Sequence, residues 1–467
     1  MDVMALGRKP KIGLLGMMIE GYEPIFPGIT KVQESYAKEL AEKMSAYADI
    51  DFPGVADNRA KIEETVEHFN KNGCDGILIV LLAYSHSSWI VRALQNNKLP
   101  IALAVLQPDD VMTPQFTEID FTRNQGIHGA QDNANVISRL GIPCQYFVGS
   151  RTSSEFTEFF DTFAKASMVY TRLRSTKVAV IGKMTGMGDL FTDDMKIYEK
   201  LGVEHCYSSI GSIYNLMQEV TDEEIAREIE KEKDIFDLDP EMPNEAYAYA
   251  QRQYLAIKRF LENGGYDAFT LHFETLGEDG RFESLPFLAA SKLLADGYGY
   301  AAEGDALCSC GVFASSLIAE DASFSEMYAL DYKVESILMC HAGEGNYKMA
   351  RKDRKPRLVY KVFNEGGLAN PPTTLFSHEP GRATIVSFAP SNDGFKLLAA
   401  TGEITDKCDL NGCEMPYLFF KPDMKQEELV EEWLKFGATH HEAVMYGDQS
   451  KVFEMLASMW KCDFKKL

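Results

Sequence analysis

The stretch Ile77-Leu78-Ile79-Val80-Leu81-Leu82-Ala83-Tyr84 is the longest uninterrupted apolar run in the chain. It is far shorter than the roughly 20 apolar residues that a membrane-spanning helix needs. A short run of this composition, bounded by turn-forming residues, is typical of a strand that is buried on both faces. We therefore predict a buried strand over residues 79–84 and no membrane partner.

On either side of this run, short apolar segments alternate with segments that carry apolar residues at helical spacing. Further strands are expected at residues 11–18 and 100–106, and helices at 29–47, 61–71 and 155–174. Alternation of this kind predicts a parallel sheet with helices on both faces. The fold class is therefore α/β, with a first doubly wound, Rossmann-like domain over residues 1–174.

Two further domains follow in the sequence. A new strand at residues 177–182 resembles the opening at 11–16 and begins a second α/β domain over residues 175–318. After residue 319 the segments are short, strand-like and separated by turn formers, which predicts a mostly antiparallel, β-barrel-like domain over residues 319–467 with helices at 426–435 and 451–460. Three domains also agree with a length of 467 residues at roughly 150 residues per domain.

The net charge limits the range of partners. Lys plus Arg number 47 against 70 Asp plus Glu, a formal charge of −23, which repels nucleic-acid backbones and anionic membranes. The nine cysteines form no CxxC pair, and residues 1–9 contain no apolar leader segment. We therefore expect reduced thiols, a cytoplasmic location and no nucleic-acid partner.

Residues 182–188, Gly-Lys-Met-Thr-Gly-Met-Gly, form a glycine-rich loop after the strand at 177–182. The spacing of the glycines fits neither the dinucleotide fingerprint nor the P-loop. A strand-to-helix turn beside a cleft is the better interpretation, and no nicotinamide or nucleotide cofactor is expected.

Histidine is scarce, with nine residues, so its positions are informative. His341 and the pair His440-His441 lie at junctions of expected elements, and Glu303 and Glu326 stand among apolar neighbours, where an acid is costly unless paired or bound to a cation. Two carboxylates and two imidazoles would suit a divalent ion such as Mn²⁺. Spacing alone leaves open the alternative that the two glutamates pair with Arg or Lys at a domain surface.

Several motifs carry a family resemblance across the whole chain. Residues 298–305, Tyr-Gly-Tyr-Ala-Ala-Glu-Gly-Asp, resemble the GYGF-x-x-EGD segment of L-arabinose isomerases. Similar matches occur, in the same order as in that family, at residues 124–129 (NQ-x-x-HG), 265–276 and 285–286 (HAFT, FEDL and LPG), 323–326 (SFME) and 437–441 (G-x-HH). The resemblance is specific at the motifs and weak between them.

The resemblance implies a metal-dependent aldose–ketose isomerase of the L-arabinose and L-fucose isomerase superfamily, which acts on a free sugar through a cis-enediol. By motif, the metal ligands would be Glu303, Glu326, His341 and His441, and the two glutamates would also be the acid–base pair. The remaining site residues would contact the sugar: Gln125, His128, Tyr84, Phe273 and His440. Because Gln125 and His128 would act from a neighbouring subunit, a homotrimer or homohexamer is expected.

Two stretches depart from the family pattern. The first strand–helix loop has Met-Met-Ile-Glu-Gly-Tyr at residues 17–22, and residues 341–345, His-Ala-Gly-Glu-Gly, replace the family's histidine-methionine-leucine-glutamate stretch. These positions contact substrate in the family, so the aldose is left open. A non-catalytic sugar-binding protein and a metal-dependent aldolase or lyase are the alternative functions.

Overall fold

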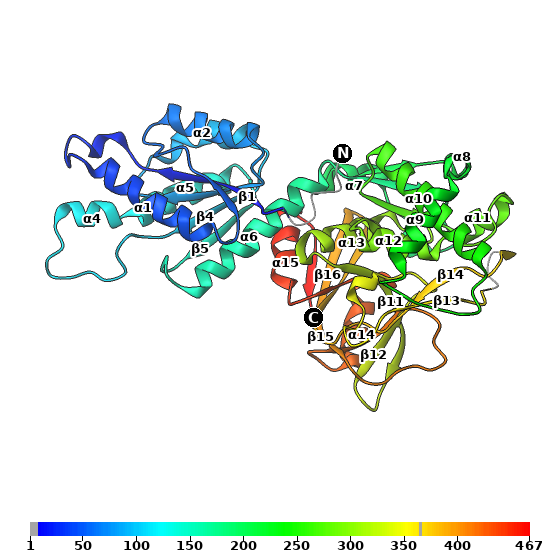
Figure 1. Ribbon diagram of the computed structural model, residues 1–467. Helices are drawn as coiled ribbons and strands as arrows, with labels where there is room; N and C mark the ends of the chain where they lie inside the picture. The colour runs from blue at the N-terminus through cyan, green and yellow to red at the C-terminus, as the bar shows by residue number, and fades with distance from the viewer. Residues whose placement is uncertain (1–7, 364–366) are drawn as a thin grey trace. The chain divides into compact units, whose positions relative to one another are not determined.

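The structure is a computed structural model that describes residues 8–363 and 367–467. Residues 1–7, which belong to the predicted N-terminal domain and to the segment judged to lack a leader, lie outside the described residues. The chain divides into two compact units, one of Arg8–Arg172 with Ser458–Lys461 and one of Leu173–Ala457 with Cys462–Leu467 (Figure 1). Each unit is described by itself, and the three-domain boundaries stay predictions.

The smaller unit is built on a parallel sheet in the order β2-β1-β3-β4-β5. Its strands are β1 (Lys11–Met17), β2 (Asp49–Asp51), β3 (Gly76–Leu81), β4 (Ile101–Val105) and β5 (Cys144–Val148). Its helices are α1 (Ile29–Met44), α2 (Arg59–Lys71), α3 (Val91–Gln95), α4 (Glu118–Asn124), α5 (Gly126–Arg139) and α6 (Ser154–Leu173), with short 3-10 turns at Glu20–Tyr22 and Ser87–Trp89.

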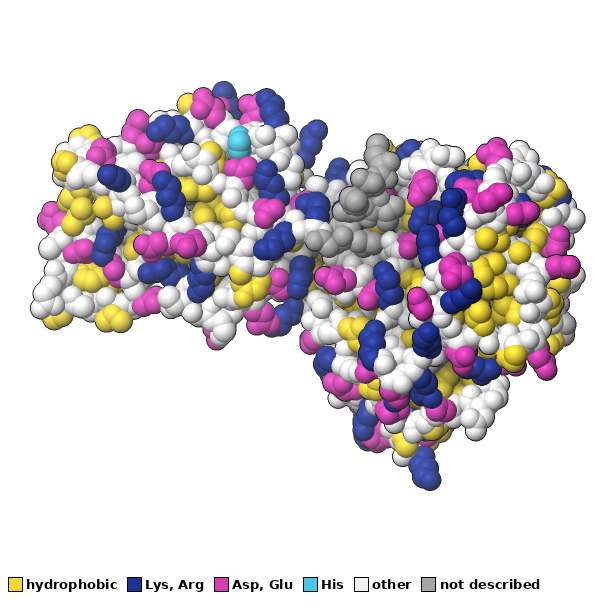
Figure 2. Space-filling view, viewed as in Figure 1, with side chains coloured by type: hydrophobic (Ala, Val, Ile, Leu, Met, Phe, Trp, Pro, Cys, Tyr) yellow, Lys and Arg dark blue, Asp and Glu magenta, His cyan; other side chains and the backbone are white. Residues whose placement is uncertain are grey.

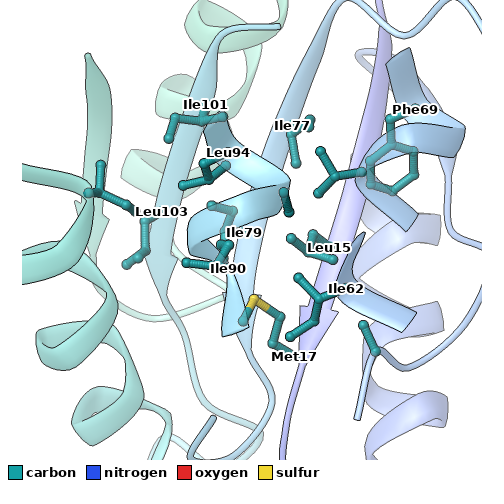
Figure 3. Close-up of a cluster of buried hydrophobic side chains, with 14 of the residues drawn as sticks. Leu15, Met17, Ile62, Phe69, Ile77, Ile79, Ile90, Leu94, Ile101 and Leu103 are labelled. Atoms are coloured by element: carbon teal, nitrogen blue, oxygen red, sulfur yellow. The ribbon is translucent and has the colours of Figure 1, made fainter. Parts of the chain in front are cut away.

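The core of this unit explains why β1 and α2 form and pack together. Leu15 and Met17, two residues apart on β1, lie on one face of the sheet, where they meet Ile62 and Phe69 of α2 (Figure 3). A Cβ at Gly13 would lie 2.5 Å from the Phe69 ring, so the glycine lets this helix approach the sheet.

The larger unit begins with a four-stranded parallel sheet in the order β10-β9-β6-β7. Its strands are β6 (Lys177–Ile181), β7 (Glu204–Tyr207), β9 (Ala268–Leu271) and β10 (Gly299–Ala302). Its helices are α7 (Asp194–Leu201), α8 (Ile210–Glu219), α9 (Asp222–Glu232), α10 (Asn244–Gly264), α11 (Phe273–Asp279), α12 (Phe287–Ala295) and α13 (Ala306–Ala319), with a 3-10 turn at Gly188–Leu190. Helix α13 is buried along nearly its whole length, as its apolar composition requires.

The rest of the larger unit is an antiparallel barrel. Its strands are β11 (Ala322–Asp331), β12 (Ser336–Cys340), β15 (Gly381–Ser391), β16 (Gly394–Thr405), β17 (Tyr417–Pro422) and β18 (His441–Tyr446). They pair in the order β15-β18-β11-β12-β17-β16, and an additional β15–β16 pairing closes the ring. The predicted fold class, two parallel-sheet α/β regions followed by a mostly antiparallel β-barrel, is confirmed.

The remaining elements lie around this barrel. Strand β19 (Phe464–Lys466) adds to β16 in parallel, and β8 (Asp237–Leu238), β13 (Arg357–Tyr360) and β14 (Pro372–Leu375) form a small separate sheet. The last helices are α14 (Gln426–Phe436) and α15 (Ser450–Trp460), and Tyr347–Met349 forms a 3-10 turn.

Two predicted strands differ from the observed ones. The strand expected at 79–84 is β3 at Gly76–Leu81, and the strand that the residues 268–273 predict is β9, which ends at Leu271. Apolar side chains continue past β3 because the loop there is itself buried, with Leu82 and Ala83 almost inaccessible, whereas the polar His272 follows β9. Phe273 therefore begins α11 rather than ending a strand.

Among the described residues, no helix is both long and apolar enough to cross a membrane. All nine cysteines are free thiols. On the face seen in Figure 2, acidic and basic side chains are interspersed.

Candidate metal and active site

Strand pairing in the barrel brings together four of the predicted site residues. Glu326 lies on β11, between β12 and β18, and pairs in register with Cys340 on one side and with His441 on the other. His341 directly follows Cys340, and His440 directly precedes the first residue of β18. Segments that are more than 100 residues apart in the sequence therefore bring their side chains to one end of the barrel.

Glu303 reaches the same place from the parallel sheet. It directly follows β10, with a left-handed backbone φ of 65° that few non-glycine residues adopt. The next residue, Gly304, has a φ of 90°, and a Cβ there would lie 2.5 Å from the Lys183 Cα. The sharp turn at Glu303-Gly304 thus needs its glycine.

The side chains converge on a small volume. His441 Nε2 lies 3.1 Å from Glu326 Oε1 and 3.5 Å from Glu303 Oε2. His440 Nε2 lies 4.0 Å from each of these oxygens. One ligand atom from each of these four residues lies within 4.8 Å of the other three. His341 Nε2 is 3.6 Å from Glu326 Oε1, at the edge of this group.

Each of the three histidines has a carboxylate beside its other ring nitrogen. Nδ1 of His441 lies 2.9 Å from Asp305 Oδ2, and Nδ1 of His341 lies 2.8 Å from Glu344 Oε2. Nδ1 of His440 lies 2.5 Å from Asp189 Oδ2. Carboxylates in this position orient the imidazole and leave Nε2 directed at the cluster.

The sequence interpretation gave no role to the three carboxylates Asp189, Asp305 and Glu344. Asp305 and Glu344 stand two and three residues after the predicted ligands Glu303 and His341. Asp189 follows the glycine-rich loop, 251 residues before His440. Local spacing was a signal for the first two, whereas only the folded chain brings Asp189 to its histidine.

The electrostatics of the cluster follow from burial and charge. Burial by itself lowers the pKa of His441, but contacts with Asp305, Glu303 and Glu326 outweigh it and raise that pKa well above its ordinary value. Burial by itself raises the pKa of Glu303, yet the neighbouring histidines bring it below its ordinary value. The carboxylates therefore favour a positive charge at this place, whether on an imidazole or on a bound cation.

His341 and Glu344, at the edge of this group, affect each other's pKa in the same way. Burial opposes charge on both His341 and Glu344, but their mutual attraction raises the pKa of the imidazole and lowers the pKa of the carboxyl to about 2. The Tyr300 hydroxyl donates a hydrogen bond of 2.7 Å to Glu344 Oε1. Glu344 is thus an ionised, fully satisfied carboxylate at the base of the site.

The residues fit a divalent cation. His441 Nε2 and Glu303 Oε2 are buried polar atoms that have no hydrogen-bond partner among the described residues, and they face each other across 3.5 Å. Buried polar atoms are normally paired, so two orphaned ones in contact call for a further group. Carboxylate oxygens and imidazole nitrogens are ligand atoms that bind Mn²⁺ and similar ions.

A cavity of about 370 Å³ opens beside the cluster. Glu303, Glu326, His341 and His440 line its polar side, together with Lys361, whose Nζ donates to the Ala342 carbonyl oxygen. The apolar residues that line the cavity are Met187, Leu271, Phe273, Leu276, Leu285, Pro286, Phe287, Phe363 and Met415. Phe273, predicted to contact the sugar, therefore lines this cavity.

The other three predicted contact residues belong to the smaller unit. The Tyr84 hydroxyl donates to Asp132 Oδ2 over 3.2 Å, and Gln125 Nε2 donates to the Tyr22 hydroxyl over 2.9 Å. His128 is exposed on α5. Their participation in a site shared between subunits stays a prediction.

Comparison with known proteins gives the same family along the whole chain. The family descriptions L-arabinose isomerase N-terminal domain, central domain and C-terminal domain match residues 23–175, 187–320 and 321–463. The chain is 28% identical over 449 residues to the L-arabinose isomerase of Levilactobacillus brevis, covering 91% of this chain and 92% of that protein. The L-arabinose isomerase of Leuconostoc mesenteroides is 26% identical over 465 residues, covering 93% and 94%.

Among solved structures, a periplasmic solute-binding protein of an ABC transporter from Actinobacillus succinogenes 130z, with bound D-allose, covers 59% of this chain and 84% of its own. Its TM-score of 0.18 and identity of 13% are too low to support an argument. The family matches and the full-length relatives, taken together with the fold, decide the identity: the chain belongs to the L-arabinose isomerase family.

Proposed function

We propose that this isomerase interconverts an aldose and its ketose with the help of a divalent cation, with Glu303 and Glu326 as the acid–base pair. One observation carries the proposal: four ligand atoms, from Glu303, Glu326, His440 and His441, lie within 4.8 Å of one another at the wall of a cavity. His341 stands beside them as a further donor, and Mn²⁺ suits this mixed oxygen and nitrogen set best.

The reaction moves one proton from C2 to C1 of the sugar and another from O2 to O1. One glutamate removes the proton from C2 of the open-chain aldose, and an acid returns a proton to C1 of the resulting cis-enediol. Glu303 Oε2 and Glu326 Oε1 both lie within 3.5 Å of His441 Nε2, so both carboxylates can reach neighbouring atoms of one small substrate. A divalent cation, when bound, supplies Lewis-acid polarisation of the sugar carbonyl.

The surrounding residues serve orientation and water exclusion. Phe273 and Phe287 give the cavity an apolar wall against the carbon chain of the sugar. The cavity volume of about 370 Å³ accommodates a monosaccharide. No electrons leave the substrate in this reaction, so no redox cofactor is needed.

The first experiment replaces each glutamate by its isosteric amide. Glu303→Gln and Glu326→Gln should each lower kcat by at least about 100-fold, because a positioned acid or base contributes about that much. Glu454→Gln, at an exposed position of α15, is the matched control and should leave turnover unchanged. Near-full turnover in either site variant would refute the assignment of the acid–base pair.

The second experiment identifies the substrate and the reaction. The purified chain is supplied with Mn²⁺ and a panel of aldoses that includes L-arabinose, and products are separated by mass and by ring form. An isomerase yields a ketose of equal mass. Two fragments would instead indicate an aldolase, and binding without conversion would indicate a sugar-binding protein.

We also propose that Gln125, His128 and Tyr84 complete the site of a neighbouring subunit in a homotrimer or homohexamer. Mixing refolded subunits that carry His128→Ala with subunits that carry Glu326→Gln should then restore activity in about a quarter of the sites, because some sites receive both intact halves. A mixture that is as inactive as its two components would contradict a shared site.

A further inference from the structure

The two carboxylate oxygens of Asp305 contact different partners. Oδ1 accepts a hydrogen bond of 2.9 Å from the backbone N–H of Cys308 and so caps the first turn of α13. Oδ2 lies 2.9 Å from His441 Nδ1. Asp305 is 3% exposed and His441 is inaccessible to solvent, so water does not compete for either contact.

These two contacts fix the proton on the ring of His441. A carboxylate only accepts hydrogen bonds, so Nδ1 of His441 must carry the hydrogen and donate it. In the neutral imidazole the other nitrogen, Nε2, then has a free lone pair. That atom is the buried, unpartnered one that faces Glu303 and Glu326.

The contact between Glu344 and His341 is built differently. Glu344 Oε2 accepts from the backbone N–H of Gly343 over 2.9 Å and also lies 2.8 Å from His341 Nδ1. Its other oxygen, Oε1, accepts from the Tyr300 hydroxyl, and a hydroxyl can either donate or accept. An amide at this position therefore keeps its carbonyl oxygen on His341 and turns its NH₂ group toward Tyr300.

We propose that Asp305 is a positioning residue that holds His441 in the Nδ1–H form and thereby keeps Nε2 available to the divalent cation. The inference rests on the proposed function. It adds that the pair Asp305–His441 responds to an amide substitution differently from the similar pair Glu344–His341. At Asp305, unlike at Glu344, a backbone N–H occupies one oxygen and a histidine the other. An amide must then present its NH₂ group to the histidine.

The test compares Asp305→Asn with Glu344→Gln in the full-length, metal-stripped protein, with Mn²⁺ alone as the probe. Asparagine caps helices as well as aspartate, so the amide oxygen stays on the Cys308 N–H. The NH₂ group then faces Nδ1 of His441, which must accept, and the ring proton moves to Nε2. We expect the Mn²⁺ dissociation constant, measured by electron paramagnetic resonance of the free ion, to rise about 100-fold. Glu344→Gln should change it little.

Two further variants separate positioning from structure. Asp193→Asn alters the capping aspartate of α7, which accepts from the Lys196 N–H and contacts no histidine among the described residues. It should bind Mn²⁺ like the wild type, because a change of helix cap alone does not alter the ring of His441. Asp305→Ser keeps a helix cap but is too short to reach His441, so it should weaken Mn²⁺ binding less than Asp305→Asn, and it replaces that variant if the latter fails to fold.

The outcomes are distinguishable. Wild-type affinity in Asp305→Asn would overturn the inference, as would equal weakening in Asp305→Asn and Glu344→Gln, because either result removes the asymmetry. If the wild-type chain itself binds no Mn²⁺, the proposed function fails first. Weak Mn²⁺ binding in a folded Asp305→Asn, with wild-type binding in Glu344→Gln and Asp193→Asn, supports the inference.

Discussion

Glu303 holds a backbone conformation that costs about 1–3 kcal/mol for a residue with a side chain. Hydrogen bonds from two directions stabilise it: its N–H donates to the Leu271 carbonyl oxygen over 2.8 Å, and its own carbonyl accepts from the Met184 N–H over 2.8 Å. The strain therefore occurs at a residue of the site, where the fold needs the carboxylate at the end of β10. A strained residue beside a cavity agrees with a catalytic position.

At this scale we predict the effect of Gly304→Ala. The new Cβ would meet the Lys183 Cα at 2.5 Å on a backbone with positive φ, so the loss of unfolding free energy should exceed about 2 kcal/mol. Mn²⁺ affinity should fall with it, because the Glu303 turn cannot keep its shape. Gly265→Ala is the control: it has a φ of 65° with no neighbour within 4 Å, and it should cost only about 1 kcal/mol and leave Mn²⁺ binding intact. Equal effects of the two variants would contradict this account of the turn.

Helices α9, α10 and α12 are joined by a buried ionic cluster. Lys292 on α12 forms ion pairs with Glu228 and Glu232 of α9 and donates to Gln251 of α10 over 2.9 Å. Its Nζ also lies 3.7 Å from the centre of the Tyr254 ring. Glu232, 1% exposed, needs this cation because an unpaired buried carboxylate is strongly unfavourable.

We therefore predict that Lys292→Met lowers the free energy of unfolding by about 3–5 kcal/mol, the usual effect of removing one partner of a buried pair. The double variant Lys292→Met/Glu232→Gln should recover part of this loss, because the orphaned charge is gone. Lys233→Met, which breaks an exposed pair with Glu230, should have almost no effect. Urea denaturation followed by circular dichroism measures all three. If Lys292→Met lowers the free energy of unfolding no more than the double variant does, the unpaired charge of Glu232 is not the cause of the loss.

His378 gives the barrel end of the larger unit a pH-dependent stability. Burial lowers its pKa to about 4, although its hydrogen bond to the Tyr417 carbonyl oxygen acts in the opposite direction. The unfolded chain, with an ordinary histidine pKa of about 6.5, then binds more protons than the native protein between these values. The native protein is therefore most stable, as far as His378 is concerned, above about pH 6.5, and this contribution to the free energy of unfolding is lost as the pH falls toward 4.

The expected difference is about 2 kcal/mol of unfolding free energy between pH 7 and pH 5, attributable to this one group. His378→Asn keeps a donor for the Tyr417 carbonyl but cannot titrate, so its stability should fall less over the same interval. Urea denaturation of both proteins at the two pH values checks this. Parallel pH dependence in wild type and variant would show that His378 is not the group responsible.

The elements themselves were largely predictable from the sequence. Apolar runs at 11–18 and 177–182 and helical periodicity at 29–47 carried enough signal to predict the strands and helices that form β1, β6 and α1. The end of β3 differs from the prediction because the apolar residues after it lie in a buried loop, and the end of β9 differs because Phe273 begins α11. Local spacing points to Asp305 and Glu344, but the contact of Asp305 with His441 depends on the cap of α13 and on the register of β11 with β18, which local pattern cannot specify.

At the scale of the whole molecule, the site residues come from two different sheets of the larger unit. Glu303 follows the parallel sheet, whereas Glu326 and His441 belong to the barrel. A cation bound by all of them would link these two parts of the fold. Metal binding should therefore stabilise the native chain as a whole and not only a loop.

We predict that Mn²⁺ at about 100 times its dissociation constant raises the free energy of unfolding by about 2.7 kcal/mol, which corresponds to a rise of several degrees in Tm. The double variant Glu303→Gln/Glu326→Gln should show no rise, because it lacks both carboxylates. Differential scanning calorimetry of the two proteins, with and without Mn²⁺, measures the effect. An identical rise in both would mean that the ion binds elsewhere.

The most direct test is an anomalous-diffraction map of crystals of this protein that have been soaked in Mn²⁺. The account predicts one strong peak per chain, within bonding distance of Glu303, Glu326 and His441 and beside the cavity that Phe273 lines. A map with its peak at another group of residues, or with none at this cluster, would contradict it.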